Sequence, residues 1–188
     1  MVITPSITQR TMVQLLRCNA TMIQLVFALL WSLRFVSAVG APEVAAGVAI
    51  AGAFALRMAW NSTRGPRARE VFRTAEGRRF MRPVTRLTIA QIVGSIVLPG
   101  IVGAVGAEQW FMPIVAATIG LFLFGFGRPL HIPAVSRIGV AATVAPLCLP
   151  LALHGDALIA LTSTSMMVAL LSSAWCCAFA ARRDTALG

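Results

Sequence analysis

Six long apolar segments follow one another along the chain, separated by short, more polar connections. They run from about 20 to 40, 43 to 60, 84 to 105, 109 to 127, 134 to 153 and 157 to 181. Each is close to the roughly 20 residues that an α-helix needs to cross the hydrocarbon core of a bilayer. None alternates apolar and polar positions as a strand does. The pattern predicts an all-α, polytopic membrane bundle of six transmembrane helices in a single domain, residues 1–188.

The composition agrees with a membrane protein. Hydrophobic residues make up 58% of the chain and charged residues only 12%, whereas a soluble domain carries about 25% charged residues. A domain of this size keeps too much surface to hide so many apolar side chains in one water-soluble core. All sixteen basic residues are arginine, which we interpret as the codon bias of a GC-rich, bacterial genome.

The arginines are distributed unequally among the connections. Residues 61–83 hold seven of the sixteen, and the connections near residues 41, 106 and 155 hold none. Positively charged segments remain on the cytoplasmic side of a membrane. We therefore expect both termini and a basic loop at 61–83 to be cytoplasmic, in the cytoplasmic (inner) membrane of a bacterium. A polar leader of 19 residues precedes the first span, so we do not expect that span to be a cleaved signal peptide.

The arginine-rich loop is interpreted as a determinant of topology. It should also attract anionic lipid head groups, at about 1 kcal/mol per basic residue near the surface. Nucleic-acid binding is not expected, because that needs a folded basic module with interleaved aromatic residues. The stretch "REVFRTAEGRRF" is instead predicted to form a short amphipathic helix at the membrane surface, with Val71, Phe72 and Phe80 toward the lipid.

The cysteines and histidines carry no metal-site spacing. The four cysteines contain no C-x-x-C pair, and His131 and His154 are not spaced as ligands beside them, so no metal, cofactor or disulfide framework is expected. The chain also lacks a recognisable Ser–His–acid set and a phosphate-binding glycine loop, and its six acids are few and peripheral. Nothing in the sequence argues for an enzyme.

Charged residues near the outer ends of the predicted helices are candidates for a polar or transport site, because ionisable groups at membrane depth are often functional. Arg34 lies roughly 10 Å inside its span at 1.5 Å per residue, where it could pair with Glu43 or extend toward the interface. Glu43, Glu108 and Asp156 each begin a helix on the outer side, where the helix dipole favours an acid. The alternative is that these acids ring an outer mouth that binds a cation.

Two further sets of polar residues are candidates. Gln91 forms a small polar stripe with Thr88 and Ser95 in the third span, interpreted as a contact between helices. Arg128 and His131 lie in the proline-containing connection "FGFGRPLHIP". There Arg128 could cap the preceding helix or hold a lipid phosphate, and His131 could titrate near neutral pH. These two residues are the candidate lipid-phosphate or interfacial pair.

The segment "EQWFMPIVAATIGLFLFGFGRPLHIP" resembles a family of small multi-pass bacterial membrane proteins of unknown function. The elements that carry the resemblance are Pro113, the step Gly120–Leu121, the loop Arg128–Pro129 and the "GRRF" that ends the arginine-rich loop. This chain has Phe122 where the family has a histidine, and Gly125 where it has a proline. The resemblance covers residues 76 to 140 and implies the architecture without an activity.

Two functional hypotheses follow. The first is a structural or interaction bundle without a transport path. The second is a transporter or channel for a proton, ion or small solute, which is expected to act as a homo-oligomer because six short helices rarely enclose such a path alone. They are distinguished by whether Gln91, Arg34 and Glu43 face a shared cavity. A lipid-modifying enzyme would need Arg128 and His131 to face a groove with an acid nearby.

Overall fold

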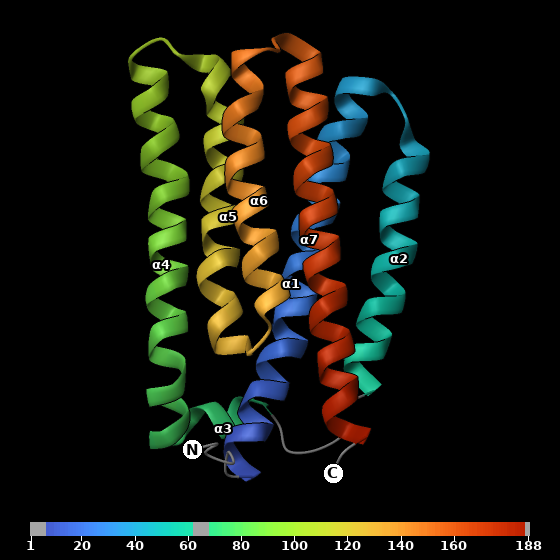
Figure 1. Ribbon diagram of the computed structural model, residues 1–188, viewed down its shortest axis with the longest axis vertical. Coiled ribbons are helices and arrows are strands. Elements are labelled where there is room, and N and C mark those ends of the chain that lie inside the picture. The colour runs from blue at the N-terminus through green and yellow to red at the C-terminus, as the bar shows by residue number, and fades with distance from the viewer. Residues whose placement is uncertain (1–6, 62–67, 187–188) are drawn as a thin grey trace.

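A computed structural model describes residues 7–61 and 68–186, and this part of the chain is helical without strands (Figure 1). The long helices are α1 (Ile7–Val39), α2 (Pro42–Asn61), α4 (Ala75–Ala104), α5 (Phe111–Leu130), α6 (Pro133–Cys148) and α7 (Gly155–Ala186). The short elements are α3 (Ala68–Arg73) and the 3-10 turns η1 (Glu108–Trp110) and η2 (Leu149–Leu151). Six of the described helices are long and apolar enough to cross a membrane, which confirms the predicted number of candidate spans.

Two helices begin earlier than the apolar segments predicted. The helix α1 starts at Ile7 and α4 at Ala75, rather than near 20 and 84. An apolar window detects only the part of a helix that matches hydrocarbon, whereas arginine, glutamine and alanine extend a helix well beyond it.

The predicted loop 61–83 is consequently helical over much of its length. The described part holds the short helix α3 and the first turns of α4, while residues 62–67 lie outside the described residues. Thr74 caps α4, since its hydroxyl accepts a hydrogen bond from the Gly77 amide at 3.0 Å. A Cβ atom at residue 77 would lie 2.8 Å from the Cα of Phe72, so glycine permits α3 to turn tightly into α4.

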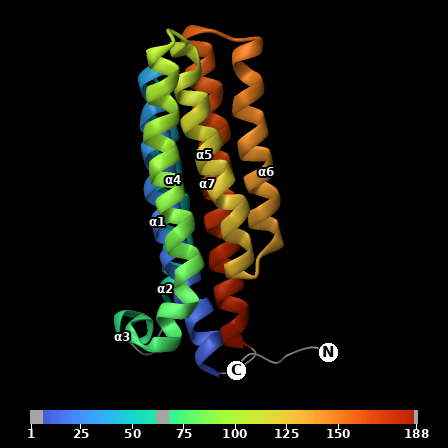
Figure 2. The same ribbon diagram turned by 90° about the vertical axis from the view of Figure 1, so that its left-hand side faces the viewer.

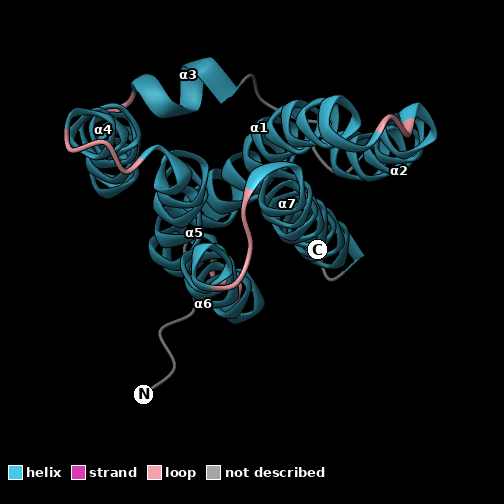
Figure 3. Ribbon diagram, turned by 90° about the horizontal axis from the view of Figure 1, so that it is seen from above, coloured by secondary structure: helices cyan, strands magenta, loops and turns pink. Residues whose placement is uncertain are grey.

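The helices form two groups. In one, α1 packs along the antiparallel α7, and α2 covers both; in the other, α5 and α6 form a hairpin with α4 against α5. The hairpin joins the first group mainly through α6 and α7, so that α4 and α2 lie at opposite ends of an elongated bundle (Figure 3). The short helix α3 crosses from α4 toward α1 at the lower end. Figure 2 shows that α5 and α6 stop short of that end.

The α5–α6 hairpin is packed closely enough to require glycine. A Cβ atom on Gly120 would lie 2.5 Å from the backbone of Ala142, and one on Gly139 would overlap the backbone of Phe124. Ser136 adds a hydrogen bond across the hairpin, donating to the Phe124 carbonyl at 2.9 Å. Small residues of this kind let membrane helices approach each other and gain dispersion contacts.

The three turns at the end of the bundle opposite α3 share a local feature (Figure 1). Each contains a glycine with positive φ, namely Gly40 at 77°, Gly106 at 73° and Gly155 at 58°. An acid then falls in the first turn of the next helix: Glu43 in α2, Glu108 in η1 and Asp156 in α7. This is where a helix N-terminus favours a negative charge.

Gly139→Ala should lower the free energy of unfolding by about 1–3 kcal/mol, because the added methyl group forces α6 away from α5. The matched control is Gly47→Ala, because a Cβ atom at residue 47 would meet nothing within 4 Å. This control substitution should stabilise the helix by at most about 1 kcal/mol. Unfolding by sodium dodecyl sulfate in mixed micelles measures both. Equal stability of the two variants would contradict the close packing of the hairpin.

Candidate functional site

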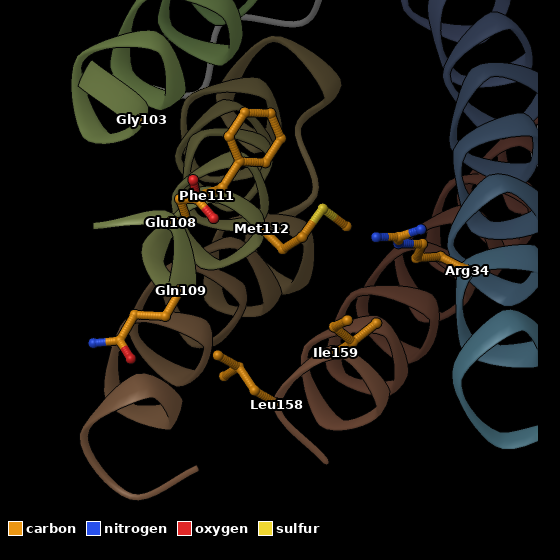
Figure 4. Close-up of a pocket in the computed structure, with 8 residues that line it drawn as sticks. All are labelled: Arg34, Gly103, Glu108, Gln109, Phe111, Met112, Leu158 and Ile159. Carbon is orange, nitrogen blue, oxygen red and sulfur yellow. The ribbon is translucent and has the colours of Figure 1, made fainter. Parts of the chain in front are cut away.

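Arg34 faces a pocket at the end of the bundle opposite the arginine-rich segment. The pocket has a volume of about 470 Å³ and is lined by residues from α1, α4, η1, α5 and α7 (Figure 4). Its lining residues are Arg34, Gly103, Glu108, Gln109, Phe111, Met112, Leu158 and Ile159. One cation, one anion and one amide therefore share a pocket that is otherwise apolar.

The ends of several helices build this pocket. Arg34 stands five residues before the end of α1 at Val39, about 8 Å below that end at 1.5 Å per residue. The turn at Gly106 ends α4 and places Glu108 and Gln109 on η1 at the pocket. Leu158 and its neighbour Ile159 come from the first turns of α7. The pocket therefore depends on how the turns at this end of the bundle bring these helix ends together.

Arg34 and Glu108 do not neutralise each other. Both side chains are exposed, and no ion pair joins them although both are described and line the same pocket. In the view of Figure 4, the Arg34 guanidinium points toward Met112, which lies between it and the Glu108 carboxylate. Within the described residues, each charge is thus left without an ion-pair partner.

The remaining candidates of the transport set lie elsewhere. Glu43 is exposed in the first turn of α2; it does not line this pocket, and it forms no ion pair with Arg34 within the described residues. Gln91 is half-buried on α4 and is also absent from the lining. This pocket therefore does not bring Gln91, Arg34 and Glu43 together; Arg34 shares it with Glu108.

The polar stripe near Gln91 does connect two helices. The Ser95 and Thr118 hydroxyls are hydrogen-bonded at 2.8 Å between α4 and α5. Thr88 instead donates to the Val84 carbonyl of its own helix at 3.0 Å. The interpretation as a contact between helices thus holds for Ser95, and the structure assigns no such bond to Gln91.

Arg128 and His131 come together at the other end of the bundle. They line a groove of about 410 Å³ between α4 and α5. His131 also lines a pocket of about 560 Å³ with Arg17 and Arg183. The histidine follows α5 in the left-handed conformation with φ of 56°, where its amide donates to the Arg128 carbonyl at 3.0 Å. Glycine usually occupies this position at a helix end.

A buried polar seam between α1 and α7 was not predicted. Its polar members are Arg17, Thr21, Gln24 and Ser32 on α1, and Thr162, Ser163 and Ser173 on α7. Thr21 donates to the Arg17 carbonyl at 2.9 Å. Among the described residues, the Gln24 amide nitrogen and the hydroxyls of Thr162, Ser163 and Ser173 have no partner. The spacing of Arg17, Thr21 and Gln24 places them on one helix face and was the available signal in the sequence.

Arg17 fastens the hairpin to the α1–α7 pair. It is buried, with 7% of its surface exposed. Its Nε donates to the Leu130 carbonyl at the end of α5 at 3.0 Å, and its Nη1 donates to the Ala180 carbonyl of α7 at 3.3 Å. A guanidinium at this place satisfies the Leu130 carbonyl, which the end of α5 leaves open, and complements the negative end of that helix dipole.

Comparisons of the chain with family models, with curated proteins and with solved structures found no match. The resemblance noted for residues 76 to 140 therefore gains no support from them. The function is argued below from the geometry of the described residues.

Arg17→Met should lower the free energy of unfolding by about 1–3 kcal/mol, because it leaves the buried Leu130 carbonyl at the end of α5 without its donor. Arg137→Met removes the same charge from an exposed position on α6 and should change stability by less than about 0.5 kcal/mol. Thermal unfolding in mild detergent, followed by circular dichroism, compares the two variants. A similar midpoint for both would mean that Arg17 does not fasten the hairpin.

Proposed function

We propose that this protein is an integral membrane interaction bundle that binds a zwitterionic head group in its outer pocket. The observation that carries the proposal is that Arg34 and Glu108 face one apolar-walled pocket from different helices without pairing. A volume of about 470 Å³ lies within the usual range for small-ligand sites, about 300–1,000 Å³.

The chemistry of the lining residues defines the ligand class. The Arg34 guanidinium suits a phosphate or carboxylate, and the Glu108 carboxylate suits an ammonium group. Phe111, Met112 and Leu158 offer apolar surface to the carbon atoms between and beside these charges. A phospholipid with an ethanolamine head group carries both a phosphate and an ammonium. It is also a component of the bilayer, so it can reach the pocket directly from the membrane.

The apolar centre of the bundle favours ligand binding over the transport of a solute through the protein. Ala28 and Trp31 of α1, Leu123 of α5, and Met166 and Leu170 of α7 are all buried in one apolar core. A charged group crosses such a layer only at high cost unless water or a polar partner accompanies it. The core therefore supports a bundle that holds its ligand at one end.

The distribution of arginine supports an orientation. The described arginines other than Arg34 lie toward the end at which α1 begins, where α3 also lies (Figure 1). By the positive-inside rule this end faces the cytoplasm, in the cytoplasmic membrane of a bacterium. The pocket of Arg34 and Glu108 would then open toward the outer leaflet.

Transport by a homo-oligomer is the second candidate. It is favoured by the α1–α7 seam, where the Gln24 amide nitrogen and the Ser173 hydroxyl are among the buried polar atoms without a partner in the described structure. Unsatisfied polar groups inside a membrane protein call for water, an ion or a substrate. Such a path would have to hydrate the apolar layer formed by Trp31 and Met166.

Dioleoylphosphatidylethanolamine should bind the purified protein in native mass spectrometry, and either Arg34→Ala or Glu108→Gln should weaken that binding about tenfold, equivalent to about 1.4 kcal/mol. Glu43→Gln is the matched control, because Glu43 is an outer acid that does not line the pocket. It should leave the affinity unchanged. Unaltered binding by the Glu108→Gln variant would remove the basis of the proposal.

Proteoliposomes separate this function from transport. With a pH or voltage gradient, the protein should pass no more protons or ions than empty liposomes do. Flux that is lost in both Arg34→Ala and Gln24→Leu, while each variant remains folded, would establish the transporter instead.

A further inference from the structure

The groove between α4 and α5 is basic at one end and apolar along the rest of its length, which matches the charged head and apolar chains of a phospholipid. It is lined by Arg79, Phe80, Pro83, Leu87, Gly125, Arg128, Pro129 and His131. On α4, residues 79, 83 and 87 follow at intervals of four and lie on one helix face. Leu87 stands eight residues from Arg79, about 12 Å farther along the axis. The basic groups thus lie at the end of the bundle, and the apolar ones extend toward its middle.

The head of the groove carries positive charge that is available to a ligand. Arg79, Arg128 and His131 come from two sides of the groove, and no acid lines it. The side chains of Arg79 and Arg128 are exposed, and neither forms a hydrogen bond or ion pair within the described residues. Arginine is the side chain best suited to grip a phosphate with two parallel hydrogen bonds.

The apolar part of the groove depends on a residue without a side chain. A Cβ atom at Gly125 would lie 2.8 Å from a methyl carbon of Leu87, so a larger residue would press into the space between the helices. Phe80, Pro83 and Pro129 complete an apolar wall with Leu87. An acyl chain fits this surface, whereas a small hydrophilic anion gains nothing from it.

We infer that this groove is a site for one anionic phospholipid, with its phosphate between Arg79 and Arg128 and an acyl chain along Leu87 and Gly125. Basic pockets between membrane helices bind such head groups. The site differs from a general attraction to the arginine-rich segment, because it uses two particular arginines and an apolar groove. It is independent of the outer pocket and of the ligand proposed there.

Native mass spectrometry of the full chain in detergent tests the site, with dioleoylphosphatidylglycerol, dioleoylphosphatidylcholine and inorganic phosphate as separate probes. In an Arg34→Ala, Glu108→Gln background, which removes both charges of the other pocket, the protein should retain phosphatidylglycerol at least tenfold more tightly than phosphatidylcholine. Arg79→Gln with Arg128→Gln should lower the phosphatidylglycerol affinity at least tenfold. Arg86→Gln with Arg137→Gln is the matched control, because it removes the same charge from exposed positions outside the groove and should lower the affinity less than threefold.

A variant of the apolar wall tests the acyl chain separately. Gly125→Leu should weaken phosphatidylglycerol at least fivefold and leave the weak affinity for inorganic phosphate unchanged. Circular dichroism confirms that each variant keeps its helices. Equal losses in the two arginine pairs would overturn the site in favour of diffuse attraction. Inorganic phosphate that binds as tightly as phosphatidylglycerol, or an unaltered Gly125→Leu variant, would overturn the assignment to a lipid.

Discussion

Segregation of charge along the bundle axis is the constraint on which the arrangement depends. A guanidinium cannot rest in hydrocarbon without a partner or an exit to water, so the end that carries nearly all the described arginines has to reach head groups or solvent. The opposite end carries Arg34 with three acids, each in the first turn of a helix. The two ends of one apolar bundle thereby differ in charge.

Arg17 meets the same constraint in another way. It lies among packed helices, and its charge is directed at the carbonyls of Leu130 and Ala180. The short α5–α6 hairpin is therefore held at a defined height against the longer α1 and α7. That height sets where the turn at His131 lies, and with it the groove and the pocket on either side of that residue.

The candidate spans were predictable because hydropathy reports them directly. So were the acids Glu43, Glu108 and Asp156 at helix starts, since an acid in the break between two apolar segments is a local signal. The early starts of α1 and α4 were not predictable, because a search for apolar segments does not detect polar residues that favour a helix. The pocket was predicted only in part. Arg34 and Glu108 were each identified as candidates, but their meeting depends on the order of helices around the bundle, which periodicity does not specify.

The polar seam shows the same limit. Serine and threonine on α7 look ordinary in a membrane helix, and their burial follows only from the pairing of α7 with α1. Likewise, Arg17 lies in the polar stretch before the first apolar segment, and its acceptors lie more than a hundred residues away in the chain, so the sequence pattern does not indicate its burial. Local sequence patterns predict the helices, whereas contacts between segments distant in the sequence determine which residues share a site.

The central claim is that the bundle spans the membrane with its arginine-rich end in the cytoplasm, and cysteine labelling tests it most directly. In a background without the native cysteines, Val105→Cys marks the turn after α4, where Val105 is 72% exposed, and Arg73→Cys marks α3. A membrane-impermeant maleimide should label residue 105 in intact spheroplasts and residue 73 only after lysis. The reverse pattern, or labelling of both residues before lysis, would contradict the account.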